Sequence, residues 1–171
     1  MPKQLLGLII GILFWGIVSL VQAETRTFNA NIRFLAPINL ASTIDPNLGN
    51  YTAGAAGRNF IMGTDGSISG INADAYAGGA NAGSVAIYGS AFNNIDIVAQ
   101  NIVNNGGVSI TAISCNYGGA GSTDCLAGIS AAAAPTDAGT ILLLGLGVAT
   151  TAAHVDGNSA APAFDIVVTY N

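Results

Sequence analysis

Lysine is absent after Lys3, and charged residues of either sign make up only 8% of the 171 residues. Beyond residue 23, three arginines stand against nine acidic residues, which leaves a net charge of −6. A surface of this sign repels phosphate backbones and anionic lipid headgroups. The scarcity of positive charge therefore disfavours nucleic acid and a membrane surface as partners of residues 24–171.

Histidine is equally scarce, because His154 is the only one in the chain. No Gly-x-Ser-x-Gly turn supplies a nucleophile for it, and most aspartates lie singly beside turn-forming residues. No glycine cluster follows a strand and opens a helix, which is the arrangement that binds phosphate. A calcium site built from loop oxygens stays open as an alternative, although no ordered ligand spacing supports it. We therefore expect no enzyme, no metal and no cofactor.

Only two cysteines occur, Cys115 and Cys125, on either side of the segment NYGGAGSTD. A redox or metal site would need closer spacing or further ligands. In an oxidising compartment, an even count at short spacing predicts a disulfide. Closing a loop of this size contributes roughly 2.5–3 kcal/mol in the chain-entropy model.

Residues 1–23 have the pattern of a secretory signal peptide. Lys3 precedes the uncharged run LLGLIIGILFWGIVSLV, and Val21-Gln22-Ala23 places small residues where signal peptidase cleaves. An uncleaved membrane anchor is the alternative, because the run is long enough to span a bilayer. Cleavage would leave a single domain over residues 24–171, secreted into the periplasm or to the cell surface and with no membrane segment.

Strand patterns dominate residues 24–171, whereas helical periodicity is hard to find. Asp65-Gly66 lies between two extended segments and predicts a hairpin. The alanine-rich stretch GISAAAAP is cut by Pro135, so we expect a loop there or at most one helical turn. Seven to nine short strands separated by Gly, Asn, Asp and Ser predict an all-β fold, an antiparallel β-sandwich, with a barrel as the alternative.

An alternating segment lies at each end of this region. On the first strand, from about Arg26 to Leu35, the residues of one face are Phe28, Ala30, Ile32 and Phe34. On the closing strand FDIVVTYN they are Phe164, Ile166, Val168 and Tyr170. Because Pro37 cannot donate to a ladder, either the first strand bends there or a second strand begins at Ile38. The first strand either pairs with the last one inside the molecule or leaves its subunit to fill a groove in the next.

Four segments, TFNANIRFLAPINL, GTDGSISG, SVAIYGSAFNNIDIV and the closing IVVTYN, resemble a family of secreted bacterial domains catalogued as a domain of unknown function. The resemblance implies an immunoglobulin-like β-sandwich related to fimbrial subunits. A weaker similarity is to chaperone–usher pilins, which tend to carry a penultimate tyrosine on the last strand, here Tyr170.

These observations predict a secreted structural or interaction protein, a pilus-like or surface-fibre subunit. Its expected partners are further copies of itself or other fibre subunits, which it contacts through the two terminal strands. The alternative is an adhesin-like binding module that presents loops at one end of the sandwich. Its candidate loops are the disulfide-tied NYGGAGSTD, with Tyr117 and Asp124, and AYAGGANAG.

Overall fold

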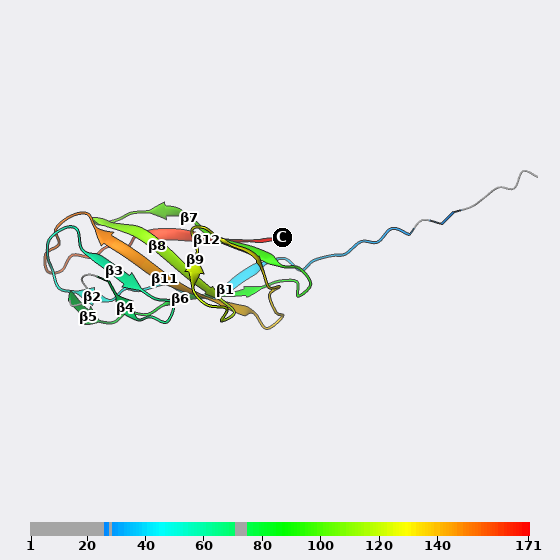
Figure 1. Cartoon of the computed structure of the whole chain (residues 1–171), viewed down its shortest axis with the longest axis horizontal. Helices are drawn as coiled ribbons and strands as arrows, with labels where there is room; N and C mark the ends of the chain where they lie inside the picture. Colours follow the sequence, from blue (N-terminus) through cyan, green and yellow to red (C-terminus); the bar gives the residue numbers. More distant parts are fainter. Residues whose placement is uncertain (1–25, 28, 71–74) are drawn as a thin grey trace, which may run out of the picture. The chain divides into compact units, whose positions relative to one another are not determined.

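The computed structural model describes residues 26, 27, 29–70 and 75–171 (Figure 1). The chain divides into two units, residues 1–33 and residues 34–171. The predicted signal peptide, its cleavage site before Glu24, and Phe28 lie outside the described residues. Within the described part of the chain, no helix has the length and apolar character needed to cross a bilayer.

Twelve β-strands and no α-helix occur in the described residues. The strands are β1 Asn39–Ile44, β2 Asn50–Tyr51, β3 Asn59–Met62, β4 Ile68–Ser69, β5 Tyr76–Gly78, β6 Gly83–Tyr88, β7 Ile95–Val103, β8 Val108–Tyr117, β9 Thr123–Asp124, β10 Ile129–Ala132, β11 Thr140–Thr150 and β12 Ala163–Tyr170. Nine remain when the two-residue strands are set aside, and their pairings are antiparallel. The predicted all-β fold is confirmed, and the immunoglobulin-like topology stays a prediction.

The large sheet is built around β11. On one edge β11 pairs with β8 from Leu142 to Thr150. On its other edge it pairs first with β6, from Thr140 to Leu144, and then with β3, from Leu146 to Ala149. β1 extends the sheet beyond β6, β4 extends it beyond β3, and β9 pairs with β8. The path β1-β6-β11-β3-β4 therefore depends on β11 at its centre.

The second sheet has the order β10-β7-β12, and a short sheet joins β2 and β5. Figure 1 shows β7 and β12 lying along one side of β8 and β11. One cluster of buried side chains joins both sheets: Ile95 and Ile97 of β7 are fully buried with Ile113 of β8 and Leu142 of β11. The two sheets therefore enclose a common core, as in a β-sandwich.

The segment GTILLLGLGVAT contains β11, and two glycines stand among its leucines. At Gly145 the reason is that the neighbouring strands β3 and β8 come very close. Leu142, Leu144 and Leu146 point to the core, each at most 6% exposed. A Cβ at Gly145 would lie 2.6 Å from the carbonyl oxygen of Met62 and would collide with the Ser114 hydroxyl. Only glycine therefore allows β3 and β8 to approach both edges of β11 at this point.

The hairpin predicted at Asp65-Gly66 is present. Ile61 and Met62 of β3 pair with Ser69 and Ile68 of β4. Gly66 has a φ of 80°, which glycine adopts readily. The Asp65 carboxylate accepts hydrogen bonds from the backbone N–H and the hydroxyl of Ser67, at 3.0 and 2.6 Å, and these bonds lower the pKa of Asp65.

Two local predictions were wrong. The expected first strand over about Arg26 to Leu35 is not formed: residues 26, 27 and 29–38 have no regular structure, and the strand begins at Asn39, after Pro37. The expected loop at GISAAAAP is partly strand β10. Its strand geometry comes from β7, because Asp96 accepts a hydrogen bond from the Ala131 N–H (2.8 Å), while Ala132 is buried against the core.

The predicted disulfide joins Cys115 and Cys125, whose Cα atoms are 5.3 Å apart and whose side chains are fully buried. The backbone of Cys125 links the two sheets. Its N–H donates to the carbonyl of Ile113 on β8 (2.8 Å), and its carbonyl accepts from the N–H of Ala99 on β7 (2.9 Å). The disulfide therefore anchors a loop that bridges both layers of the sandwich.

Replacing both cysteines by alanine is expected to lower the free energy of unfolding by about 3 kcal/mol, because the unfolded chain regains the freedom of the closed loop. Urea unfolding followed by circular dichroism measures the change. As a control, a reducing agent should destabilise the wild-type protein and leave the double variant unaffected. Equal unfolding midpoints for the two proteins would contradict a stabilising role.

Candidate functional site

A groove of about 840 Å³ lies between β1 and β12. In the described structure, β1 pairs only with β6 and β12 pairs only with β7, so each strand keeps one unpaired edge. Both strands line the groove. Unpaired strand edges present backbone N–H and C=O groups that another strand can bind.

The floor of the groove reaches the core. Leu144 and Leu146 of β11 and Val85 of β6 line it, although each is at most 6% exposed. On the wall formed by β1, Leu40 and Ile44 are 38% and 57% exposed. Apolar side chains of both sheets therefore meet water along this groove, which is unfavourable unless another apolar surface covers them.

The charge of the groove is negative. Asp45 and Asp165 are the only charged residues among those that line it. The Asp165 carboxylate accepts a hydrogen bond of 2.7 Å from the side chain of Asn101 and remains exposed. A segment that binds here is therefore favoured by apolar side chains on one face and by positive charge nearby.

Tyr170 links the two walls at one end of β12. Its hydroxyl donates to the carbonyl oxygen of Ala36 (2.6 Å) and accepts from the backbone N–H of the buried Ser90 (2.5 Å). The start of β1 is thus held beside the end of β12 although the two strands do not pair. One of the two expectations from the sequence was that the first and last strands pair inside the molecule. Within the described residues they do not pair.

The predicted assembly residues fall into two groups. Ala30, Ile32 and Phe34 lie in the segment without regular structure, where Ile32 and Phe34 are 77% and 84% exposed. On β12, four half-buried residues pack against the core of their own chain: Phe164, Ile166, Val168 and Tyr170. Of these four, Phe164 and Ile166 line the groove.

The β1 wall of this groove was not foreseen as part of a site. A strand beginning at Ile38 was one of the two consequences expected of Pro37, and β1 begins one residue later, at Asn39. Leu40, Ile44 and Asp45 were nevertheless not singled out, because the expected assembly residues were placed on the segment before Pro37.

Several residues of the loops proposed for an adhesin-like module make contacts within the fold, although residues 118–124 are exposed. Tyr117 is only 6% exposed, and burial raises its pKa. Asp124 accepts a hydrogen bond of 2.9 Å from the Leu126 N–H and so stabilises a turn. Tyr76 accepts one of 2.9 Å from the Ala80 N–H inside AYAGGANAG. Tyr117 therefore cannot be a surface contact for a ligand.

His154 lies where its backbone pairs with Gly54, at 2.8 and 3.0 Å in the two directions. Its ring nitrogen Nε2 is 3.4 Å from the Gly107 carbonyl. The described residues contain no group of three or more His, Cys, Asp or Glu side chains placed to hold a metal ion.

Comparisons with protein-family models, with curated proteins and with solved structures return no match for this chain.

Replacing Tyr170 by Phe is expected to destabilise the protein by about 1–3 kcal/mol, because the buried Ser90 N–H loses its acceptor. Urea unfolding measures the loss. Tyr88→Phe is the matched control, since the structure gives the Tyr88 hydroxyl no hydrogen bond to another described residue. If both variants unfold at the same urea concentration, the Tyr170 hydroxyl does not hold β1 to β12.

Proposed function

We propose that this chain is a secreted subunit of a pilus-like surface fibre, in which residues 28–35 of one copy fill the groove of the next. The observation that carries the proposal is the groove itself, which is bordered by two unpaired strand edges and floored by core leucines. A strand inserted there would bond to both edges through its backbone. Such an insertion would cover the exposed side chains of Leu40 and Ile44 on the wall of the groove and close the sandwich.

The segment 28–35 suits the groove in length and pattern. Eight extended residues span about 26 Å, which is comparable to the eight residues of β12. Alternation places Phe28, Ala30, Ile32 and Phe34 on one face, toward the groove floor. Arg33 lies on the same segment, and the groove carries Asp45 and Asp165, so the charges of the two surfaces are complementary.

The segment of a second copy fits the groove better than the segment of the same chain does. To pair antiparallel with β1 of its own chain, the segment would need a hairpin turn around Ala36 and Pro37. The Ala36 carbonyl is already bonded to Tyr170, and Pro37 has no N–H to close a turn. The described residues of this stretch also lack the positive φ angles that tight hairpin turns need.

Export to an oxidising compartment agrees with this assignment. The Cys115–Cys125 disulfide is compatible with an extracellular or periplasmic location. The resemblance of the sequence to secreted fimbrial-like domains points in the same direction.

The variant Ile32→Asp is expected to abolish assembly, because a carboxylate would be placed against the apolar floor. Asn31→Asp is the matched control: it adds the same charge one position away, on the other face of an extended strand. The full chain is exported, and the secreted protein is examined by size-exclusion chromatography and electron microscopy. A wild-type protein that stays monomeric, with residues 28–35 protected from hydrogen exchange, would overturn the proposal.

The groove is tested separately with a synthetic peptide of residues 26–35 added to the Ile32→Asp protein. We expect Ile44→Asp, on the groove wall, to weaken peptide binding at least about ten-fold, a loss of about 1.4 kcal/mol. Ile61→Asp is the control, because Ile61 is a similarly exposed isoleucine on β3 and lies outside the groove. Equal effects of the two substitutions, measured by fluorescence anisotropy, would show that the peptide binds elsewhere.

A further inference from the structure

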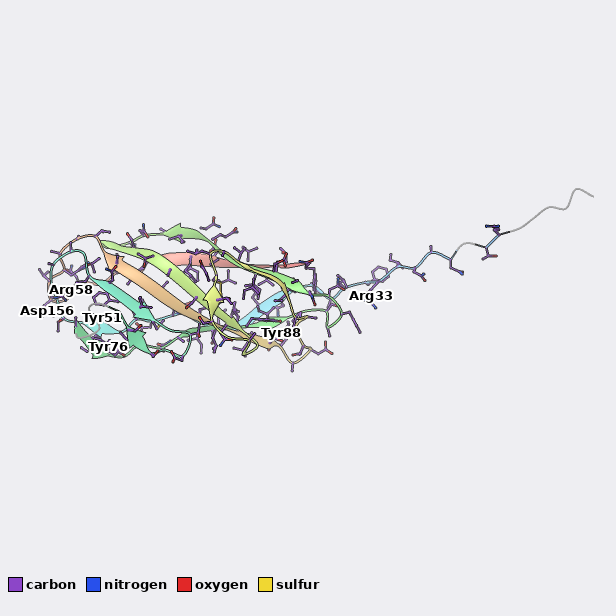
Figure 2. The ribbon with its side chains drawn as sticks, viewed as in Figure 1. Arg33, Tyr51, Arg58, Tyr76, Tyr88 and Asp156 are labelled. Atoms are coloured by element: carbon purple, nitrogen blue, oxygen red, sulfur yellow. A yellow bond between two sulfur atoms is a disulfide. The ribbon has the colours of Figure 1, made fainter. Side chains whose placement is uncertain are left out.

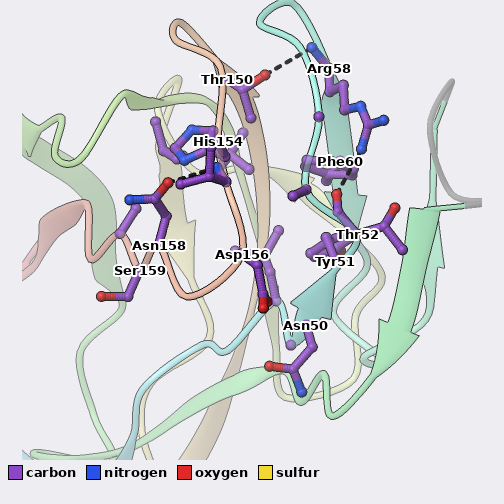
Figure 3. Close-up of a pocket in the computed structure, with 18 of the residues that line it drawn as sticks. Asn50, Tyr51, Thr52, Arg58, Phe60, Thr150, His154, Asp156, Asn158 and Ser159 are labelled. Atoms are coloured by element: carbon purple, nitrogen blue, oxygen red, sulfur yellow. Dashed lines mark hydrogen bonds between the residues drawn. The ribbon is translucent and has the colours of Figure 1, made fainter.

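A second cavity, of about 530 Å³, lies within the unit of residues 34–171 (Figure 3). Its walls come from residues 48–60, from the end of β11 and from the loop of residues 154–162. Figure 2 shows Tyr51, Arg58 and Asp156 together at the end of the sandwich where β2 and β5 lie. Sites for small ligands have this size and gather their walls from several elements.

One wall of the cavity is aromatic. Tyr51 and Phe60 line it with their ring centroids 3.9 Å apart, and Tyr76 supports Tyr51 at 5.5 Å. The Tyr51 hydroxyl is buried and has no hydrogen-bond partner among residues 26, 27, 29–70 and 75–171. Burial raises the pKa of Tyr51 to about 12, so this hydroxyl is a neutral donor at physiological pH. A buried donor without a partner is unusual in a native structure and calls for an explanation.

Arg58 gives the cavity its charge. It is the only arginine or lysine in residues 34–171, a stretch that contains eight aspartates. No carboxylate among the described residues forms an ion pair with it. The only arginine of this unit therefore lies in the wall of a cavity, and no carboxylate of the described residues neutralises it.

The fold holds the Arg58 side chain in one place. Its Nη1 donates to the Thr52 carbonyl (2.8 Å), and its backbone N–H donates to the Thr150 hydroxyl (3.0 Å), as the dashed lines in Figure 3 show. The guanidinium lies against Gly54, where a Cβ would collide with it. Within the described residues, one of its five N–H donors has a hydrogen-bond partner, so a fixed, planar set of donors is left that could bind a carboxylate.

Polar side chains complete the cavity. The side-chain oxygen Oδ1 of Asn158 accepts a hydrogen bond from the backbone N–H of Val155 (2.7 Å). The side-chain NH₂ group of Asn158 is left to donate to a ligand. The Asn50 amide donates to the Gly78 carbonyl (3.4 Å), which leaves the Asn50 oxygen as an acceptor. Asp156 is exposed, and Figure 3 shows Tyr51 between it and Arg58, so the two charges lie at separate ends of the aromatic wall.

We propose that this cavity binds an acidic sugar, a hydroxylated ring that carries one carboxylate. Arg58 binds the carboxylate, because a guanidinium matches its two oxygens. The wall of Tyr51 and Phe60 packs against the C–H face of the ring. Donors and acceptors on Asn50, Asp156 and Asn158 bind its hydroxyl groups. The site is distinct from the loops NYGGAGSTD and AYAGGANAG that the sequence suggested for binding.

The test uses the full secreted chain and saturation-transfer NMR titrations with D-glucuronate, D-galacturonate and N-acetylneuraminate. Their neutral counterparts are D-glucose, D-galactose and N-acetylmannosamine. At least one acidic sugar is expected to bind about ten-fold or more tightly than its counterpart. Equal affinities for the acidic and neutral sugars, or no binding of any acidic sugar, would overturn the proposal without recourse to a variant.

Arg58→Gln is expected to weaken acidic-sugar binding about ten-fold or more and to remove the preference over the neutral sugar. Ser122→Asp, in the exposed disulfide loop, is the control, because it changes the net charge by the same amount and should leave binding unchanged. If Arg58→Gln does not fold, Arg58→Lys keeps the charge and should still weaken binding. Wild-type affinity in a folded Arg58 variant would overturn the proposal.

Each titration is repeated on the Ile32→Asp protein. We expect this variant to retain acidic-sugar binding, because Ile32 is not part of the cavity. Binding by the variant would support the sugar site whether or not the wild-type protein forms fibres. Fibres that form without any sugar binding would overturn the sugar proposal alone.

Discussion

The pairing of β11 is the constraint on which the rest of the sandwich depends. This strand is paired on one edge by β8 and on the other by β6 and β3, and its leucines face the core. β1 and β4 reach the sheet only through β6 and β3. Gly145 lets the strands β3 and β8 approach both edges of β11. The sequence Leu-Gly-Leu-Gly therefore places leucines in the core and still allows strands to pair on both edges.

This arrangement leaves the sandwich open along one side. β1 ends the large sheet and β12 ends the small one, and no described strand joins them. The Tyr170 side chain makes hydrogen bonds across the opening, where its hydroxyl reaches Ala36 and Ser90. The opening leaves two strand edges unpaired and Leu40 and Ile44 exposed, so an added strand would bond to the edges and cover these apolar side chains.

Local patterns in the sequence predicted those elements whose structure is determined locally. The hairpin at Asp65-Gly66 follows from turn chemistry, and the core-facing side of β12 follows from strict alternation. β10 could not be predicted in this way, since Ile129–Ala132 has no strand pattern and is held by Asp96, which is distant in sequence. The segment before Pro37 alternates like a strand, but its described residues have no regular structure, because alternation alone does not supply a paired neighbour.

The candidate sites were harder to foresee, because their residues come from distant segments. The groove joins residues near 40, 85, 144 and 165, and the cavity joins residues near 51, 58, 150 and 156. No motif spans either set. One signal was nevertheless visible in the composition. Arg58 is the only arginine or lysine in the 138 residues from 34 to 171, which marks it as a candidate functional residue.

The position of Arg58 as the only arginine or lysine of residues 34–171 also bears on cleavage by proteases. Trypsin-like proteases cleave after arginine or lysine, and residues 34–171 offer them one such bond, Arg58–Asn59. The Arg58 carbonyl is bonded to the Thr150 N–H (2.8 Å) and the Arg58 N–H to the Thr150 hydroxyl (3.0 Å), so this bond is protected unless β3 opens. Arg26 and Arg33 are exposed and lie where the chain has no regular structure, so we expect these enzymes to cleave there before they cleave at Arg58.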